Sequence, residues 1–246
     1  MFNNLKKEYS QKGYFTIRNV FSEATINNLN NEIKVAQNID KYFDKNNEIR
    51  RIERLFNKGK ELNSINQKFL EIIKNIFEED YNIFKDKFNA KPAGGEGFFA
   101  HYDGVFIFED KNNEKKNGWY EYSDCFINIL LALDPCNKKN GTIEISKIHN
   151  ENFENLLLNT KNNGTPDLLE EVENKLIFEP IELNAGDLVI FSNQCPHRSK
   201  KNFSNSSRRT LYYTYTPARL GSFYEKYFDD KKNSKNKTSK SLNGEI

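Results

Sequence analysis

Residues 98–108 read Phe98-Phe99-Ala100-His101-Tyr102-Asp103-Gly104-Val105-Phe106-Ile107-Phe108, a run rich in the aromatic residues that strands favour. Successive side chains of a strand point to opposite faces, so His101 and Asp103 are expected to lie on the same face. Two histidines and one carboxylate suit Fe(II) and leave three coordination positions open, and His197 is the candidate for the missing ligand. A His-x-Asp pair also occurs by chance, as an exposed or hydrogen-bonded pair, so the rest of the chain must decide.

The size and charge of the chain narrow the class of protein. With 246 residues it can form one large domain or two small ones around a sizeable core. Its 37 lysines and arginines nearly balance 35 aspartates and glutamates, which argues against a nucleic-acid or membrane partner. The N-terminus has no apolar signal core, and no run is long enough to span a membrane. The three cysteines, Cys125, Cys136 and Cys195, form neither a zinc pattern nor a disulfide framework, which favours a reducing cytoplasm.

The first 90 residues are expected to form mainly a layer of helices. Residues 14–18 alternate like a short strand, and Ser22 can then cap a helix whose apolar residues, from Ile26 to Ile33, lie on one stripe. A second helix is predicted from Ser64 to Phe77, where apolar residues recur at helical spacing. Such a layer would pack on a sheet formed by later parts of the chain.

Residues 91–228 show the pattern of a β-sheet core, after a Pro-Ala-Gly-Gly turn signal. Many short strands in one region predict a jelly roll or a barrel. The predicted strands are Phe98–Phe108, Cys125–Leu133, Thr142–Ile145, Leu176–Leu183, Leu188–Phe191 and Thr210–Thr216. The polar segment Asp110–Asp124 is expected to be a long loop that can act as a lid. Residues 229–246 are expected to be a polar, disordered tail outside a single domain at 1–228.

Two arginines follow the second candidate histidine. His197 comes just past a buried strand, and Arg208 and Arg209 then begin another strand, on opposite faces. An arginine about ten residues beyond a metal-binding histidine can hold a ligand carboxylate bidentately. The residues that share the face of Arg208 are the more polar ones, so Arg208 is expected to line the cavity and Arg209 to point toward the helical layer. Taken alone, the pair could also be surface charges at the start of a strand.

These motifs occur in a specific order. From the N-terminus to the C-terminus they are His101-x-Asp103, Asn140-Gly141, Gly186-Asp187 with an apolar run to His197, and Arg208. In order and spacing the chain resembles the phytanoyl-CoA dioxygenase-like (PhyH) branch of the Fe(II)/2-oxoglutarate-dependent oxygenases. The segments 13–22 and 211–215 also look like that family, and the resemblance covers about residues 12–228.

The resemblance implies an all-β core with flanking helices, folded as a double-stranded β-helix of the cupin-like, jelly-roll kind. It implies iron held by His101, Asp103 and His197, with 2-oxoglutarate and O2 as co-substrates. By position in the family's motifs, Arg208, Ser199 and Asn128 would contact 2-oxoglutarate. Asn128 could instead be a polar residue that is simply satisfied within the sheet.

The implied activity is a dioxygenase that hydroxylates, or otherwise oxidises, a small molecule and releases succinate and carbon dioxide. Related halogenases replace the carboxylate ligand with a small residue, so Asp103 favours hydroxylation. The chain departs from the family near His149 and at Arg198, and both changes are expected to affect the substrate pocket. Trp119 is a further candidate for contact with the substrate.

Three other functions are compatible with parts of the pattern. A cupin-like, metal-dependent isomerase or epimerase would not need Arg208. A non-catalytic jelly-roll binding module would not need His197 on the same side as His101. The same oxygenase chemistry could also act on a protein or a nucleic acid; near-neutral charge speaks against a nucleic acid, although the lysine-rich tail is compatible with one. The pattern identifies neither the substrate nor an oligomeric state.

Overall fold

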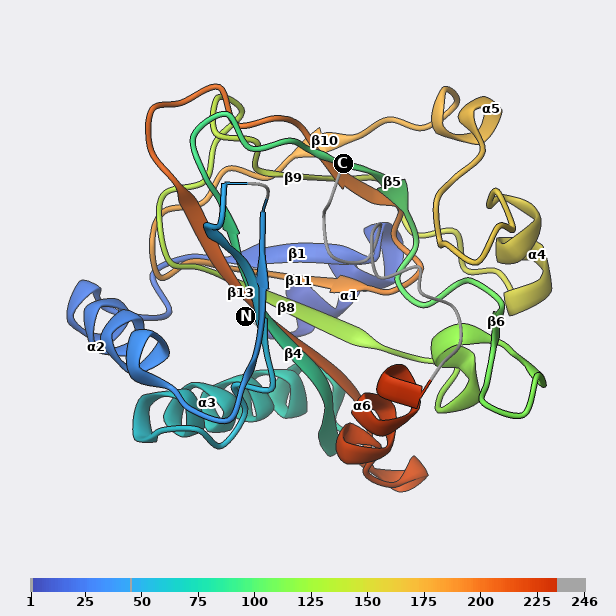
Figure 1. Cartoon of the computed structure of the whole chain (residues 1–246), viewed down its shortest axis with the longest axis horizontal. Helices are drawn as coiled ribbons and strands as arrows, with labels where there is room; N and C mark the ends of the chain where they lie inside the picture. The colour runs from blue at the N-terminus through green and yellow to red at the C-terminus, as the bar shows by residue number, and fades with distance from the viewer. Residues whose placement is uncertain (1, 45, 234–246) are drawn as a thin grey trace.

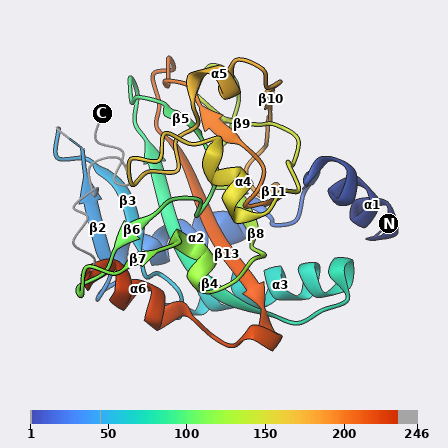
Figure 2. The ribbon, with the colours of Figure 1, turned by 90° about the vertical axis from the view of Figure 1, so that its right-hand side faces the viewer.

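The computed structural model describes residues 2–44 and 46–233 as two antiparallel sheets, with helices outside the larger one (Figures 1 and 2). The larger sheet has seven strands in the order β1-β11-β8-β13-β4-β3-β2, and the smaller has four in the order β10-β9-β12-β5. A two-stranded hairpin, β6-β7, lies beside them. The predicted jelly-roll fold with flanking helices is thereby confirmed.

The elements have the following bounds. The helices are α1 (Phe2–Lys12), α2 (Glu23–Val35), α3 (Lys60–Phe77), α4 (Phe153–Leu158), α5 (Glu170–Glu173) and α6 (Tyr224–Asn233), with 3₁₀ turns η1 (Gly118–Glu121) and η2 (Ala218–Leu220). The strands are β1 (Tyr14–Ile17), β2 (Asp40–Phe43), β3 (Ile49–Glu53), β4 (Tyr81–Lys91), β5 (Phe98–His101), β6 (Phe108–Glu109), β7 (Lys115–Lys116), β8 (Ile127–Ala132), β9 (Ile143–Ile145), β10 (Glu179–Pro180), β11 (Leu188–Ser192), β12 (His197–Ser199) and β13 (Arg208–Pro217). None of the described helices has the length and apolarity that crossing a membrane requires.

The outer face of the larger sheet is covered by α2 and α3, as Figure 1 shows. Alternate residues of the central strands, such as Leu131, Ile190 and Tyr213, pack against the apolar stripes of these helices in the main core. Helix α2 begins where the Ser22 hydroxyl accepts a hydrogen bond from the backbone N–H of Thr25. The predicted helical layer therefore exists, and its two helices start and pack as their sequences indicate.

The inner face of the larger sheet meets the smaller sheet. Leu130, Val189 and Phe191 point away from the helices and pack with Ile143 and Ile145 of β9 in a second core cluster. The side chains of each central strand alternate between these two cores. Polar side chains on the inner face can therefore be accommodated only where the two sheets are not packed against each other. Two cavities lie in that space.

The strand predicted over 98–108 is interrupted after His101. Strand β5 ends there, and the chain bends at Gly104, whose φ of +81° favours glycine. Asp103 therefore lies in a turn and not on the same strand face as His101. Its backbone N–H donates to the carbonyl of Asn193, which fixes the turn. The expectation that one strand holds both ligands is wrong, although both side chains still reach one site.

The first 90 residues contribute more strands than predicted. Besides β1, they supply β2, β3 and most of β4, which join the larger sheet. Strand β4 escaped sequence analysis because Lys85, Lys87 and Lys91 occupy alternate positions and resemble a solvent-exposed face. All three side chains lie at the wall of a cavity.

Other segments differ in detail from their predicted form. Strand β12 was not predicted, and the strand expected at 176–183 is reduced to the two residues of β10. The expected loop 110–124 contains β7 and η1, and its Trp119 is buried against Phe84 and Phe126, at ring-centroid distances of 5.3 and 5.2 Å. Helix α6 continues to Asn233, into the expected tail, and the remainder of that tail lies outside the described residues.

Candidate metal centre

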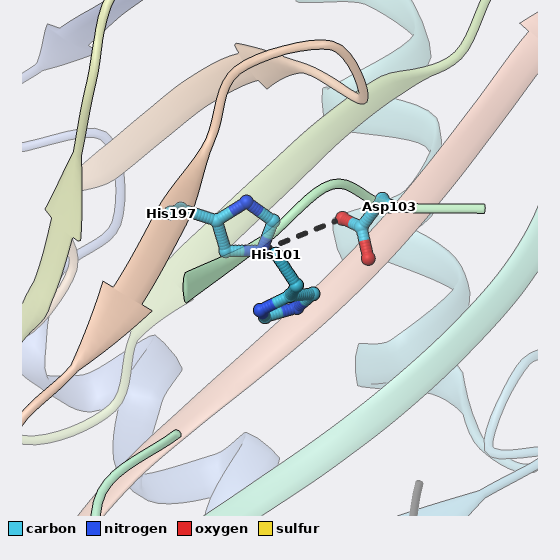
Figure 3. A group of neighbouring side chains, drawn as sticks. All are labelled: His101, Asp103 and His197. Carbon is cyan, nitrogen blue, oxygen red and sulfur yellow. Dashed lines mark ion pairs between the residues drawn. The ribbon is translucent and has the colours of Figure 1, made fainter. Parts of the chain in front are cut away.

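Three side chains from two adjacent segments of the smaller sheet converge on one point (Figure 3). Antiparallel pairing of β12 with β5 sets His197 directly opposite His101, and Asp103 follows two residues after the end of β5. The ligand atoms of the three residues lie within 4.8 Å of one another. The two imidazole rings are 4.2 Å apart, centroid to centroid. The candidate ligands predicted from the sequence are therefore brought together.

The orientation of both rings is set by backbone carbonyls. Nδ1 of His101 lies 2.9 Å from the carbonyl oxygen of Phe99, and Nδ1 of His197 lies 3.0 Å from that of Cys195. Each Nδ1 must carry the proton, because a carbonyl can only accept, so each Nε2 presents a lone pair. Burial lowers the pKa of His197, and burial together with its histidine neighbour lowers that of His101 to about 3. Both rings are therefore neutral near pH 7, as metal ligation requires.

Asp103 is held ionised and in place. Burial alone would raise its pKa, but the electrostatic influence of His197, and then of Lys87 and His101, outweighs this effect and lowers the pKa to about 2. The side-chain amide of Asn128 donates to Asp103 Oδ2 at 3.0 Å, and Asn128 Oδ1 in turn accepts from the Thr214 hydroxyl at 2.7 Å. This relay fixes the orientation of the carboxylate from the neighbouring strands β8 and β13.

The donor set fits a divalent transition metal. Nε2 of His197 lies 3.7 Å from Asp103 Oδ2, which is too long for a hydrogen bond, and it has no proton to donate. A lone pair and a carboxylate oxygen facing each other repel unless a cation lies between them. Two neutral imidazoles and one carboxylate on one side of a site are the ligands of a non-haem Fe(II) centre with open positions.

A small cavity of about 60 Å³ lies on one side of this triad and is strongly cationic. His101 and His197 border it, and Arg50, Lys91 and Arg208 are buried in its wall. No aspartate or glutamate of the described residues lines it. Nη2 of Arg208 donates to the carbonyl of Gly141 at 2.8 Å, while its buried Nε has no hydrogen-bond partner among the described residues. Such a cavity suits an anion with at least one carboxylate.

Lys91 is the buried lysine in the wall of the small cavity. Its ammonium donates to the Ser199 hydroxyl at 2.8 Å and to the carbonyls of Gly141 and Lys200. Burial, and then repulsion from Arg208 and Arg50, lowers the pKa of Lys91 to about 6. A bound anion would relieve that repulsion.

A larger cavity of about 110 Å³ lies on the other side of the triad. His101 and Asp103 border it, and its wall combines aromatic side chains with charged ones. The aromatic lining residues are Phe98, Phe99, Phe106, Phe108, Trp119, Tyr122 and Tyr227. Trp119 is held by the turn after Asp103, since its backbone N–H donates to the carbonyl of Gly104 at 3.1 Å. The triad therefore separates a cationic cavity from a larger one with aromatic side chains in its wall.

The remaining predicted residues fall in different places. Ser199 and Arg208 line the small cavity and Trp119 lines the large one, whereas Asn128 lies behind Asp103. Arg198 borders the small cavity, but its guanidinium is engaged by Glu144 and Glu173 at 2.8 and 2.7 Å.

His149 borders neither cavity. It hydrogen-bonds the hydroxyl of Tyr102 through Nδ1, and Tyr102 points away from the metal ligands that flank it in sequence. Sequence analysis missed Arg50 and the lysines of β4. Tyr81, Ile83 and Phe88 favour a strand in this segment, but lysine at positions 85 and 87 is equally typical of an exposed strand face, and no local signal marks Arg50.

Two facing antiparallel sheets with a His-x-Asp and a distal histidine at their open end define the double-stranded β-helix class of non-haem iron oxygenases. The sequence profile of the phytanoyl-CoA dioxygenase (PhyH) family matches residues 9–210, and the chain belongs to that family. The family predicted from the motifs is confirmed.

Two curated relatives have names that describe phosphonate chemistry. A "Methylphosphonate hydroxylase" of Gimesia maris is 31% identical over 153 residues, which are 62% of this chain and 52% of that protein. A "2-aminoethylphosphonate dioxygenase" of an uncultured bacterium, HF130_AEPn_1, is 29% identical over 163 residues, 65% of this chain and 55% of that protein. The chain thus matches about half the length of these relatives.

Solved structures share the fold. EctD from S. alaskensis, solved with 2-oxoglutarate and 5-hydroxyectoine, is 15% identical with a TM-score of 0.66, covering 88% of this chain and 76% of that one. The epimerase SnoN, in complex with Fe3+, alpha ketoglutarate and nogalamycin RO, is 12% identical with a TM-score of 0.66, covering 88% of this chain and 84% of that one. At such identities the likeness establishes the fold and not the substrate.

Proposed function

We propose that this protein is an Fe(II)- and 2-oxoglutarate-dependent dioxygenase that hydroxylates a small organic molecule. The observation that carries the proposal is that the candidate metal ligands lie between two cavities and line both of them. His101 and His197 line a cationic cavity whose charge suits a dicarboxylate, while His101 and Asp103 line the larger cavity, which would hold a substrate. An isomerase that does not use 2-oxoglutarate, or a simple binding module, would not need the cationic cavity with its buried Arg208.

Each residue has a definite task in this proposal. When bound, iron and 2-oxoglutarate supply the oxidation of a C–H bond by O2, with release of succinate and carbon dioxide. His101, His197 and Asp103 hold one face of the metal, and Asn128 keeps the carboxylate oriented. Arg208 binds the distal carboxylate of 2-oxoglutarate bidentately.

Ser199 and Trp119 complete the two cavities. The Ser199 hydroxyl accepts a hydrogen bond from Lys91 and would donate its own proton to a carboxylate bound in the small cavity. Trp119, buried beside the turn after Asp103, excludes water from the substrate side.

The carboxylate ligand favours hydroxylation over halogenation. Asp103 occupies the coordination position that chloride would need, and Asn128 fixes it there. Product from the wild-type protein in chloride buffer is therefore expected to contain oxygen and no chlorine. Mass spectrometry of the product decides this point, and a chlorinated product would contradict the assignment.

The names of the relatives suggest where to look for the substrate. Because this family member matches part of a methylphosphonate hydroxylase and part of a 2-aminoethylphosphonate dioxygenase, we infer that an alkylphosphonate is the first substrate to test. We further infer that residues 1–228 act as one domain, since β1 pairs with β11 inside the core sheet. The free cysteines Cys125, Cys136 and Cys195 support a cytoplasmic location.

The test has two stages. Anaerobic addition of Fe(II) and 2-oxoglutarate should produce a weak visible charge-transfer band with one iron per chain, and His101→Ala should remove both. Oxygen is then admitted with methylphosphonate or 2-aminoethylphosphonate, and succinate is measured against hydroxylated product. An intact band in His101→Ala would refute the metal assignment.

A further inference from the structure

Two lysines in the larger cavity, the buried Lys85 and the partly buried Lys87, lack the ionic partners that such charges normally have. Lys85 and Lys87 lie on the inner face of β4 and line the cavity together with Asp103. Within residues 2–44 and 46–233, neither ammonium takes part in an ion pair or a hydrogen bond with another side chain. Their contacts are with rings: Lys85 Nζ lies 4.3 Å from the centroid of Trp119, and Lys87 Nζ lies 4.7 Å from that of Tyr212. Buried charges are costly unless paired, so a missing partner is implied.

The acidic residues of the same cavity do not supply that partner. Glu53 pairs with Lys231 and Arg51, and Asp230 pairs with Lys226. Asp103 is the candidate metal ligand and would be neutralised by the metal. Lys85 and Lys87 therefore leave positive charge facing the cavity beside the metal position.

We propose that Lys85 and Lys87 bind the acidic group of the substrate, so that the substrate is a small organic anion that extends from β4 toward the iron. This inference rests on the proposed function and adds the charge class of its substrate. The aromatic walls then enclose the carbon chain next to the acidic group, and the C–H bond to be oxidised lies beside the His101 and Asp103 ligands. Two adjacent ammonium groups suit a phosphonate dianion better than a monocarboxylate.

2-Oxoglutarate does not account for both lysines. Its carboxylates have Arg208 and Lys91 in the small cavity, which Lys85 does not border. Lys87 borders both cavities and could contact either anion. Lys85 is therefore the sharper probe of the substrate side. Burial lowers the pKa of both lysines, and a bound anion would offset that cost.

Asp167 indicates what else the substrate carries. Asp167 is buried at the cavity wall, and its backbone forms an isolated β-bridge with His101 of the smaller sheet. The two lysines belong to the larger sheet. Its Oδ1 has no hydrogen-bond partner, and it makes no ion pair within the described part of the chain. An acceptor across the cavity from two cations suits a zwitterion, so 2-aminoethylphosphonate is expected to bind more tightly than methylphosphonate.

The test measures binding and not turnover. Calorimetric titrations of methylphosphonate, 2-aminoethylphosphonate and acetate are performed anaerobically on the protein with Fe(II) and 2-oxoglutarate. Lys85→Met and Lys87→Met should weaken both phosphonates roughly 10- to 100-fold, the effect of losing one charge-assisted hydrogen bond. Acetate is expected to bind less tightly than either phosphonate. Asp167→Asn should weaken only 2-aminoethylphosphonate.

Lys91→Met is the matched control, because it removes a buried lysine of the same strand from the other cavity. It should weaken 2-oxoglutarate and leave the phosphonates nearly unchanged, whereas Lys85→Met should do the reverse. Thermal unfolding checks that each variant folds. Phosphonate binding that is absent in the wild type, or unchanged in both Lys85→Met and Lys87→Met, overturns the inference. A missing charge-transfer band overturns the proposed function instead, so the two failures are distinguishable.

Discussion

Among single residues, the neighbouring Arg208 and Arg209 are expected to differ in their effect on 2-oxoglutarate affinity. Arg208 is buried in the small cavity, whereas Arg209 is paired with Asp134 outside it, with a shortest contact of 2.6 Å. Arg208→Ala should raise the 2-oxoglutarate dissociation constant roughly thirty- to several-thousand-fold, because losing the partner of a buried charge costs about 2–5 kcal/mol. Arg209→Ala should change it little. Calorimetry on both variants decides, and the reverse ranking would place the co-substrate elsewhere.

Asn128 provides a second prediction at this scale. Its amide donates to the metal-facing oxygen of Asp103, so Asn128→Ala should weaken Fe(II) binding about 10- to 100-fold by freeing the carboxylate. Thr214→Val is the graded control, because it removes only the hydrogen bond that orients Asn128. Iron affinity is measured by anaerobic titration. Unchanged affinity in Asn128→Ala would mean that the turn alone orients Asp103.

The site residues that could be predicted from the sequence are those that stand in a recognisable local motif. His101 and Asp103 are two residues apart, and His197 follows an apolar run that could only be a buried strand. Lys85 and Lys87 carry no such signal, because lysine is usually exposed and lysine at alternate positions therefore also fits an exposed strand face. Only the pairing of β4 with β13 and β3, at the centre of a covered sheet, makes them internal.

At the scale of elements, the turn after β5 decides the geometry of the site. The sequence predicted a continuous strand there, since the run 98–108 is rich in aromatic residues and Gly104 is its only turn-favouring glycine. The chain turns because Gly104 adopts a positive φ and Trp119 packs over it. A Cβ at position 104 would lie 2.5 Å from Trp119 Cγ, so the Trp119 ring can pack here only because residue 104 is a glycine.

Gly104→Ala is therefore expected to disturb both the turn and the metal ligand within it. The substitution should lower the free energy of unfolding by about 2–4 kcal/mol, from backbone strain plus the displaced Trp119, and should weaken iron binding. Gly94→Ala is the matched control, because Gly94 has a φ of +72° but an added Cβ meets nothing within 4 Å. Denaturant unfolding of both variants separates strain from packing. Equal losses would show that Trp119 does not depend on Gly104.

In the whole molecule, the charges of the sequence nearly balance, but cationic side chains cluster around the interior cavities. The sequence has a formal net charge of +2, which predicts no strong external field. The fold nevertheless gathers Arg50, Lys85, Lys87, Lys91 and Arg208 around two adjacent cavities. Composition could not reveal this arrangement, because it depends on which side chains of β4 and β13 face inward.

This interior charge should make the unliganded, metal-free protein more stable as the pH rises from 6.5 to 8.5. Burial, with repulsion from Arg208 and Arg50, lowers the pKa of Lys91 to about 6, and burial lowers that of Lys87 to about 8. In this window the unfolded chain binds more protons than the folded one, so the free energy of unfolding rises with pH, by at most about 1.4 kcal/mol per unit for each group.

Denaturant unfolding across this pH range measures the slope. Lys91→Met should flatten it, whereas Lys74→Met, at an exposed position on α3, should not. Saturating 2-oxoglutarate should also flatten it, because an anion that keeps Lys91 charged removes the difference in proton binding between the folded and unfolded states. A slope that is the same in wild type and Lys91→Met would show that this ammonium stays charged in the empty cavity, held by the three oxygens to which it donates.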